Sequence, residues 1–234
     1  MNKWILGLLV LVFVAFSTVA FAATPQLPTG IVVTGNTTLE KEPDQTQIFF
    51  TIYTTGKTSE EAQAENAKIS SRVYQSFMAD GIDRSAWKTV QMDLSPQYDN
   101  ESGKVRGYQM SHAVLLTLSG TDKAGKIVSL LVDSGVENIQ YIRFGLKDPK
   151  AAQREALAEA TKDARERAEI IAAETGATIK SVRYVSEPRI VYQDNAGYAN
   201  TNRYKTAGAS IDQQVWAGSV NVSATVEIHF ELVK

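Results

Sequence analysis

The stretch VNVSATVEIHFEL, residues 220–232, decides the fold class of this chain, because it has the clearest alternation of apolar and polar residues in the sequence. Apolar side chains occupy every even-numbered position, whereas Asn, Ser, Thr, Glu and His occupy the odd-numbered ones. A period of two places the apolar side chains on one face of a β-strand. We therefore expect a sheet with one face packed on a core and the other face in water or against another subunit.

Two long helices are predicted upstream of this strand. The first begins at Thr58, where Glu61 three residues later completes a capping box, and Gly81 ends it. The second begins with Asp148 as N-cap and Pro149 at its first position, and runs to Thr175 before Gly176. Its expected buried stripe is mostly small, which lets the helix lie close to a sheet: Leu157, Ala160, Ala164, Ala168 and Ile171.

The remaining segments predict an α+β fold. The order strand, long helix, strand, strand occurs over 46–118 and again over 138–232, so we expect two such units with the long helices packed on antiparallel sheets. An internal duplication, with units 30–120 and 136–234 inside one domain of residues 23–234, is a hypothesis that follows. The predicted strands are 31–35, 46–53, 87–98, 105–118, 138–146, 178–192 and 214–232, and a shorter helix is expected at 122–134.

The N-terminal segment has the pattern of a secretory signal peptide over residues 1–22. Lys3 provides the positive start, residues 4–16 are apolar, and Ala20-Phe21-Ala22 is a small-x-small cleavage pattern. We expect the mature chain to begin at Ala23 in the periplasm. The alternative is an uncleaved anchor, since residues 4–23 approach the length of a bilayer span. No later segment is apolar enough, so no integral membrane segment is expected after cleavage.

Composition argues against several functional classes. With 24 Lys and Arg against 26 Asp and Glu, the formal charge is −2, which does not favour nucleic-acid binding. The absence of Cys excludes disulfides and thiolate metal sites, and G-x-S-x-G, H-E-x-x-H and P-loop motifs are absent. His112 and His229 lie in predicted strands, where surface or hydrogen-bonded roles are commonest. We expect no enzyme activity, cofactor or metal, although a cleft in which either His faces a carboxylate and a hydroxyl would favour a hydrolase.

A long polar segment, residues 193–213, is the candidate interaction loop. Loops of this length in compact domains tend to be functional or disordered. Tyrosine and arginine side chains suit protein contacts, so Tyr198, Arg203 and Tyr204 are the predicted contact residues. A hairpin tip without a partner is the alternative.

Several short motifs, in order over about 190 residues, resemble one known family, the SIMPL-domain (DUF541) proteins of bacterial envelopes. That family includes periplasmic immunogenic proteins and proteins named for oxidative-stress defence. No single motif is specific, but their order and spacing carry the resemblance. The motifs are Val33-Thr34-Gly35, Pro43-Asp44, Asp80-Gly81-Ile82, residues 91–98 (QMDLSPQY), Gly107-Tyr108, residues 138–144, the Ala-rich helix from Ala156 to Ala168, Gly176 and Gly218.

The resemblance implies an α+β fold in the periplasm, no established catalytic residues and, in some members, a large ring-like or channel-like homo-oligomer. We therefore expect a non-enzymatic exported protein that self-assembles and supports envelope or oxidative-stress defence. The alternative is a periplasmic adaptor or chaperone-like module that uses the 193–213 loop or a sheet edge to bind an envelope protein.

Overall fold

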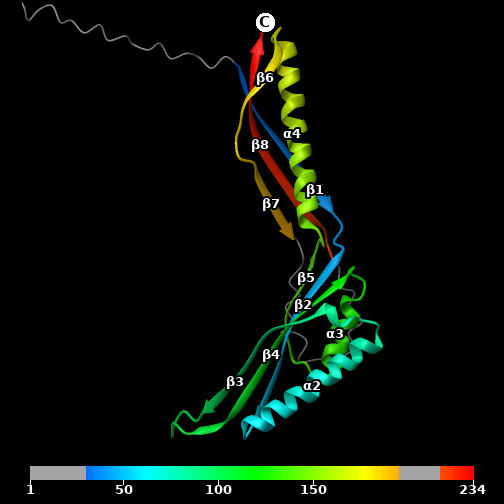
Figure 1. Ribbon diagram of the computed structural model, residues 1–234, viewed down its shortest axis with the longest axis vertical. Coiled ribbons are helices and arrows are strands. Elements are labelled where there is room, and N and C mark those ends of the chain that lie inside the picture. The colour runs from blue at the N-terminus through cyan, green and yellow to red at the C-terminus, as the bar shows by residue number, and fades with distance from the viewer. Residues whose placement is uncertain (1–29, 195–216) are drawn as a thin grey trace, which may run out of the picture.

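The computed structural model describes residues 30–194 and 217–234, which form two antiparallel sheets with helices packed on them (Figure 1). The predicted α+β fold is confirmed. The two sheets lie roughly end to end, so the molecule is elongated. In chain order the elements are β1 (Ile31–Lys41), β2 (Gln45–Gly56), α2 (Ser59–Ala79), a short 3-10 helix (Arg84–Ala86), β3 (Trp87–Tyr98), β4 (Val105–Ser119), α3 (Ala124–Asp133), β5 (Asn138–Gly145), α4 (Pro149–Glu174), β6 (Thr178–Val185), β7 (Arg189–Asp194) and β8 (Val220–Val233).

The first sheet is built around β8, the strand with the alternating pattern. β1 pairs with β8 over its whole length, and β6 and β7 pair with β8 on its other side. The even-numbered residues of β8 from Val220 to Phe230 are buried against α4, as the alternation predicts. β1 extends beyond the predicted 31–35 to Lys41, because pairing with β8 holds its polar half in the sheet.

The prediction of one continuous strand over 178–192 is wrong, because the structure has two strands there. β6 and β7 lie in succession along β8, and residues 186–188 separate them. Pro188 has no N–H to donate to a ladder. The Ser186 N–H still donates to the Glu227 carbonyl at 3.0 Å, so the chain stays beside β8 across the break.

The buried stripe of α4 contains only alanine, which corrects part of the prediction. Ala160, Ala164 and Ala168 are buried as expected, but Leu157 is half-buried and Ile171 is 43% exposed. The helix lies too close to the sheet for larger side chains. The buried positions recur every fourth residue, and since a helix has 3.6 residues per turn, the stripe rotates by about 40° per step and follows the twist of the sheet. They are Ala152, Ala156, Ala160, Ala164, Ala168 and Ala172.

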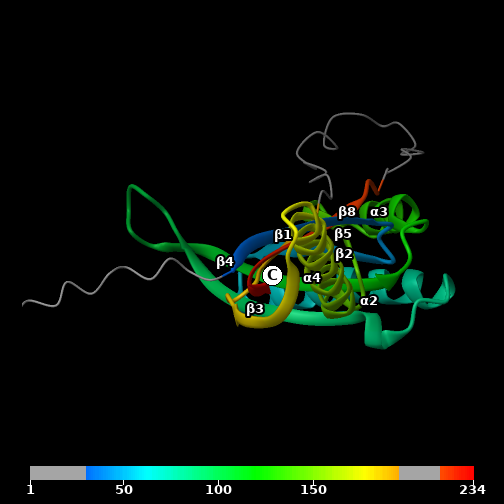
Figure 2. The ribbon, with the colours of Figure 1, turned by 90° about the horizontal axis from the view of Figure 1, so that it is seen from above.

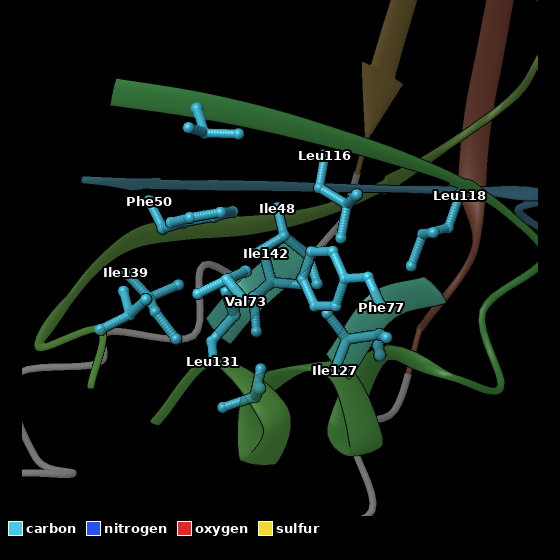
Figure 3. Packing of buried hydrophobic residues seen from close by; sticks show 14 of the residues in the cluster. Ile48, Phe50, Val73, Phe77, Leu116, Leu118, Ile127, Leu131, Ile139 and Ile142 are labelled. Atoms are coloured by element: carbon cyan, nitrogen blue, oxygen red, sulfur yellow. The ribbon is translucent and has the colours of Figure 1, made fainter. Parts of the chain in front are cut away.

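The second sheet has the order β3-β4-β2-β5, and α2 and α3 cover one of its faces. Figure 3 shows the core between them, where Ile48 and Phe50 from β2 meet Val73 from α2 and Ile127 from α3. The predicted cap of α2 is confirmed, since the Thr58 hydroxyl accepts a hydrogen bond from the Glu61 N–H at 3.2 Å. The Glu61 carboxylate accepts from the N–H of Lys57, one residue earlier than a capping box requires.

The two halves of the chain exchange strands. β1 belongs to the first half of the chain but pairs with β8 of the second half, whereas β5 belongs to the second half but pairs with β2 of the first half. Where the sheets meet, the Leu146 N–H donates to the Tyr192 hydroxyl at 3.1 Å, and Arg143 lies 3.3 Å from Asp194. The proposed duplication stays a prediction, which superposition of the two halves would test.

Candidate interaction surface

The outer strand of the second sheet, β3, carries an unusual amount of exposed apolar surface. Among the described strands it pairs only with β4, so its other edge carries no ladder. Val90, Met92 and Tyr98 are 52%, 56% and 57% exposed. Val90 lies in a bulge, because the register with β4 shifts between Thr89 and Gln91. Figure 2 shows the turn end of the β3–β4 hairpin extending away from the helices.

A groove of about 470 Å³ lies between β3, β4 and the N-terminal half of α2. Its sheet side is formed by Met92, Met110 and His112, which share the face toward α2. Met110 and His112 are buried, whereas Met92 is open to solvent. The lining on the helix side is neutral and consists of Gln63, Ala64, Asn66, Ala67 and Ser70.

His112 lies between two hydroxyl groups at the inner wall of this groove. Its Nδ1 is 3.2 Å from Ser70 Oγ, and its Nε2 is 2.9 Å from Thr89 Oγ1. Burial lowers the pKa of His112 below its usual 6.5, so the imidazole is neutral at pH 7. Among the described residues, no carboxylate hydrogen-bonds to it. This arrangement lacks the Asp of a Ser-His-Asp triad, which orients the imidazole and stabilises its protonated form.

His229 is on the open face of the first sheet, opposite α4. Its Nε2 lies 3.2 Å from Glu227, and its ring meets Tyr184 edge-to-face at 5.4 Å. On the same face, hydrogen bonds from Arg183 and then Lys180 lower the pKa of Glu231 to about 2. Such exposed ion pairs stabilise a fold only slightly. A carboxylate and a phenol do face His229, but on an open sheet surface rather than in a cleft.

A second hollow, of about 590 Å³, lies where β2 ends and α2 begins. Gly107 lets β4 approach the end of β2 there, since a Cβ at this position would lie 2.8 Å from the Gly56 carbonyl oxygen. Lys57, Glu61 and Arg106 give it charges of both signs. The Glu61 carboxylate accepts a hydrogen bond from the Lys57 N–H, which holds this carboxylate at the start of α2.

The predicted contact residues Tyr198, Arg203 and Tyr204 lie outside the described residues, so the structure does not place them. Over 30–194 and 217–234, no three His, Asp or Glu side chains gather closely enough to hold a metal ion. No helix in these two ranges is both long and apolar enough to cross a bilayer. Sequence reasoning missed the surface around β3, because Val90, Met92 and Leu94 at every second position predict a strand but not its place at a sheet edge.

Comparison with known proteins agrees with the motif resemblance. The family described as "SIMPL: Protein of unknown function (DUF541)" matches residues 31–230. A "26 kDa periplasmic immunogenic protein" of Brucella abortus is 26% identical over 183 residues, which is 74% of this chain and 73% of the relative. A protein of the same name from Brucella melitensis matches to the same extent. The predicted recognition is confirmed, and the names of these relatives point to the periplasm.

Proposed function

This chain belongs to the SIMPL family, and from that premise we propose that it is an exported, non-enzymatic periplasmic protein that assembles with copies of itself through the β3 edge and supports the envelope under oxidative or related stress. Support for the compartment comes from the signal-peptide pattern of residues 1–22 and from the names of the Brucella relatives. Mass spectrometry of protein recovered from the periplasm tests this part. A chain that begins at Ala23 is expected, and a chain that retains Met1 would contradict it.

The observation that carries the assembly proposal is the exposed apolar edge of β3. An edge strand presents unpaired N–H and C=O groups that can template another strand, and natural proteins usually blunt such edges with charge or proline. β3 has Pro96 and two register shifts with β4, yet Val90, Met92 and Tyr98 each expose about half of their surface or more. A second copy would cover these side chains and satisfy the backbone groups together.

The charges on β3 favour a second copy over a charged partner. Lys88 pairs in register with Leu115 and Asp93 with Ser111, so both lie on the face away from α2. Where an antiparallel contact between two β3 strands places Lys88 of one copy near Asp93 of the other, unlike charges meet on that face. The other side chains of β3 are uncharged, so they add no charge repulsion between copies.

Size-exclusion chromatography with light scattering on residues 23–234, at several concentrations and without detergent, tests assembly. We expect a discrete oligomer that Val90→Lys with Tyr98→Lys converts to a smaller species, because lysines on an edge oppose pairing. Ile170→Lys is the matched control, since Ile170 is 63% exposed on α4, away from β3. A concentration-independent monomer, or an oligomer unchanged by the β3 lysines, would overturn the proposal. A monomer would favour the adaptor function.

The stress role is tested in a strain that lacks the gene. The wild-type and Ile170→Lys genes should restore survival in peroxide, whereas the gene with both β3 lysines should not, because the proposed role requires assembly. If all three genes restore survival equally, and the three proteins reach equal levels in the periplasm, stress defence does not require assembly and the proposal is contradicted.

A further inference from the structure

The groove beside β3 gathers three side chains that are good ligands for soft metal ions. Met92 pairs directly with His112 across β3 and β4, and Met110 lies two residues before His112 on the same face of β4. All three line the groove between the sheet and α2. The expectation of no metal site rested on His, Cys and carboxylates alone, and the two thioether groups change that judgement. We propose that Met92, Met110 and His112 form a binding site for a monovalent soft cation of the Cu(I) type.

Spacing on the sheet supports this assignment. Directly opposed residues of an antiparallel pair have Cβ atoms about 5 Å apart, and residues two apart on one strand lie about 7 Å apart. Methionine has three rotatable bonds and no branch, so both sulfur atoms can turn toward one ion beside the imidazole. Three neutral donors from one sheet face are then available within a single groove.

The hydrogen bonds of His112 prepare one ring nitrogen as a ligand. The Thr89 hydroxyl, 2.9 Å from Nε2, can accept the ring N–H and so fix the orientation of the imidazole. Nδ1 then carries the lone pair and faces Ser70, which itself lines the groove. A bound ion takes the place of the Ser70 hydroxyl at Nδ1.

The lining selects the class of ion. Thioether sulfur and imidazole favour Cu(I) and its redox-inert analogue Ag(I), whereas Ca²⁺ and Mg²⁺ require several oxygen ligands. No charged side chain lines the groove, so nothing there would neutralise the double positive charge of a divalent ion.

Titration of residues 23–234 with Ag(I), followed by native mass spectrometry and tryptophan fluorescence, tests the proposal. The ring of Trp87 is 6.1 Å from that of His112, so in a Trp216→Phe background its fluorescence reports on the groove. We expect one Ag(I) per chain with a change in Trp87 emission. Zn²⁺ at the same concentration should leave both readouts unchanged.

Leucine variants identify the ligands, because Met→Leu conserves side-chain volume and preserves the fold. Met92→Leu with Met110→Leu should weaken Ag(I) binding at least 100-fold. Met78→Leu is the matched control, since Met78 is 49% exposed on α2 and does not line the groove. Thermal unfolding should show equal stability for all variants. Absence of a one-to-one complex, or equal affinity of the double variant and the control, would overturn the proposal.

Discussion

Replacing Gly35 by Ala tests the close approach of β1 to α4. A Cβ at position 35 would lie 2.0 Å from the Ala160 carbonyl oxygen and 2.6 Å from the Ala164 nitrogen. Both atoms belong to the helix backbone, so no rotamer change relieves the clash. An ordinary contact needs at least 3.4 Å, which means that α4 must move from the sheet by about 1.4 Å at this point.

The cost of this displacement follows from the alanine stripe. Six buried alanines face the sheet, and at about 0.8 kcal/mol per buried methyl group they contribute roughly 5 kcal/mol. A gap of about 1 Å removes up to half of a dispersion contact, so Gly35→Ala should destabilise the protein by about 2 to 3 kcal/mol. In a domain of this size, that lowers Tm by roughly 5 to 10 °C.

Urea and thermal unfolding followed by circular dichroism measure this effect. Thr34→Ala is the control, because Thr34 is exposed on the same strand and should change the free energy of unfolding by less than about 0.5 kcal/mol. Ala164→Gly added to Gly35→Ala should give no rescue, since the shortest contact is with the Ala160 carbonyl. Near-wild-type stability of Gly35→Ala, or rescue by the double variant, would refute the reasoning.

Three further outcomes concern pH and capping. Burial lowers the pKa of His112, so the contribution of this residue to stability is present above pH 6.5 and is lost as the pH falls through the lowered value. His112→Gln should therefore reduce the pH dependence of the free energy of unfolding, measured in urea, below about pH 6.5. The pKa of Glu231 falls from 4.5 to about 2, so its contribution is lost between those values, and Glu231→Gln should reduce the acid sensitivity of unfolding there. Thr58→Ala removes the N-cap acceptor of α2 and should cost about 1 kcal/mol in urea unfolding, whereas Thr58→Ser should restore it.

Local patterns predicted most of the elements correctly. The alternation of β8, the Thr58 cap and the Asp148-Pro149 start of α4 each depend on neighbouring residues, and the structure confirms all three. The prediction for the stripe of α4 is correct only in part, because hydrophobicity alone does not distinguish Leu157 and Ile171 from buried residues. Their exposure is determined by the close approach at Gly35, which lies more than 100 residues earlier in the chain.

The interaction surface could not be predicted because it depends on strand neighbours. Val90, Met92 and Leu94 have the spacing of an inward-facing strand, and only the order β3-β4-β2-β5 shows that β3 is at an edge. The proposed metal ligands could not be predicted from the sequence for the same reason. Met92 and Met110 are 18 positions apart, and the register of β3 with β4 brings them beside His112.

The motif Pro43-Asp44 gains a physical role from the exchange of strands. Asp44 lies in the short link between β1 and β2, where the two sheets meet. Its N–H donates to the Gly145 carbonyl at 3.0 Å, its carbonyl accepts from the Gly120 N–H at 2.7 Å, and its carboxylate accepts from the Lys147 N–H at 2.7 Å. One residue thus joins the ends of β4 and β5 to the link that enters the first sheet. These three hydrogen bonds restrain the angle between the two sheets. The proposed assembly through the β3 edge requires such a restraint, because a closed ring forms only when its contact surfaces keep a constant angle.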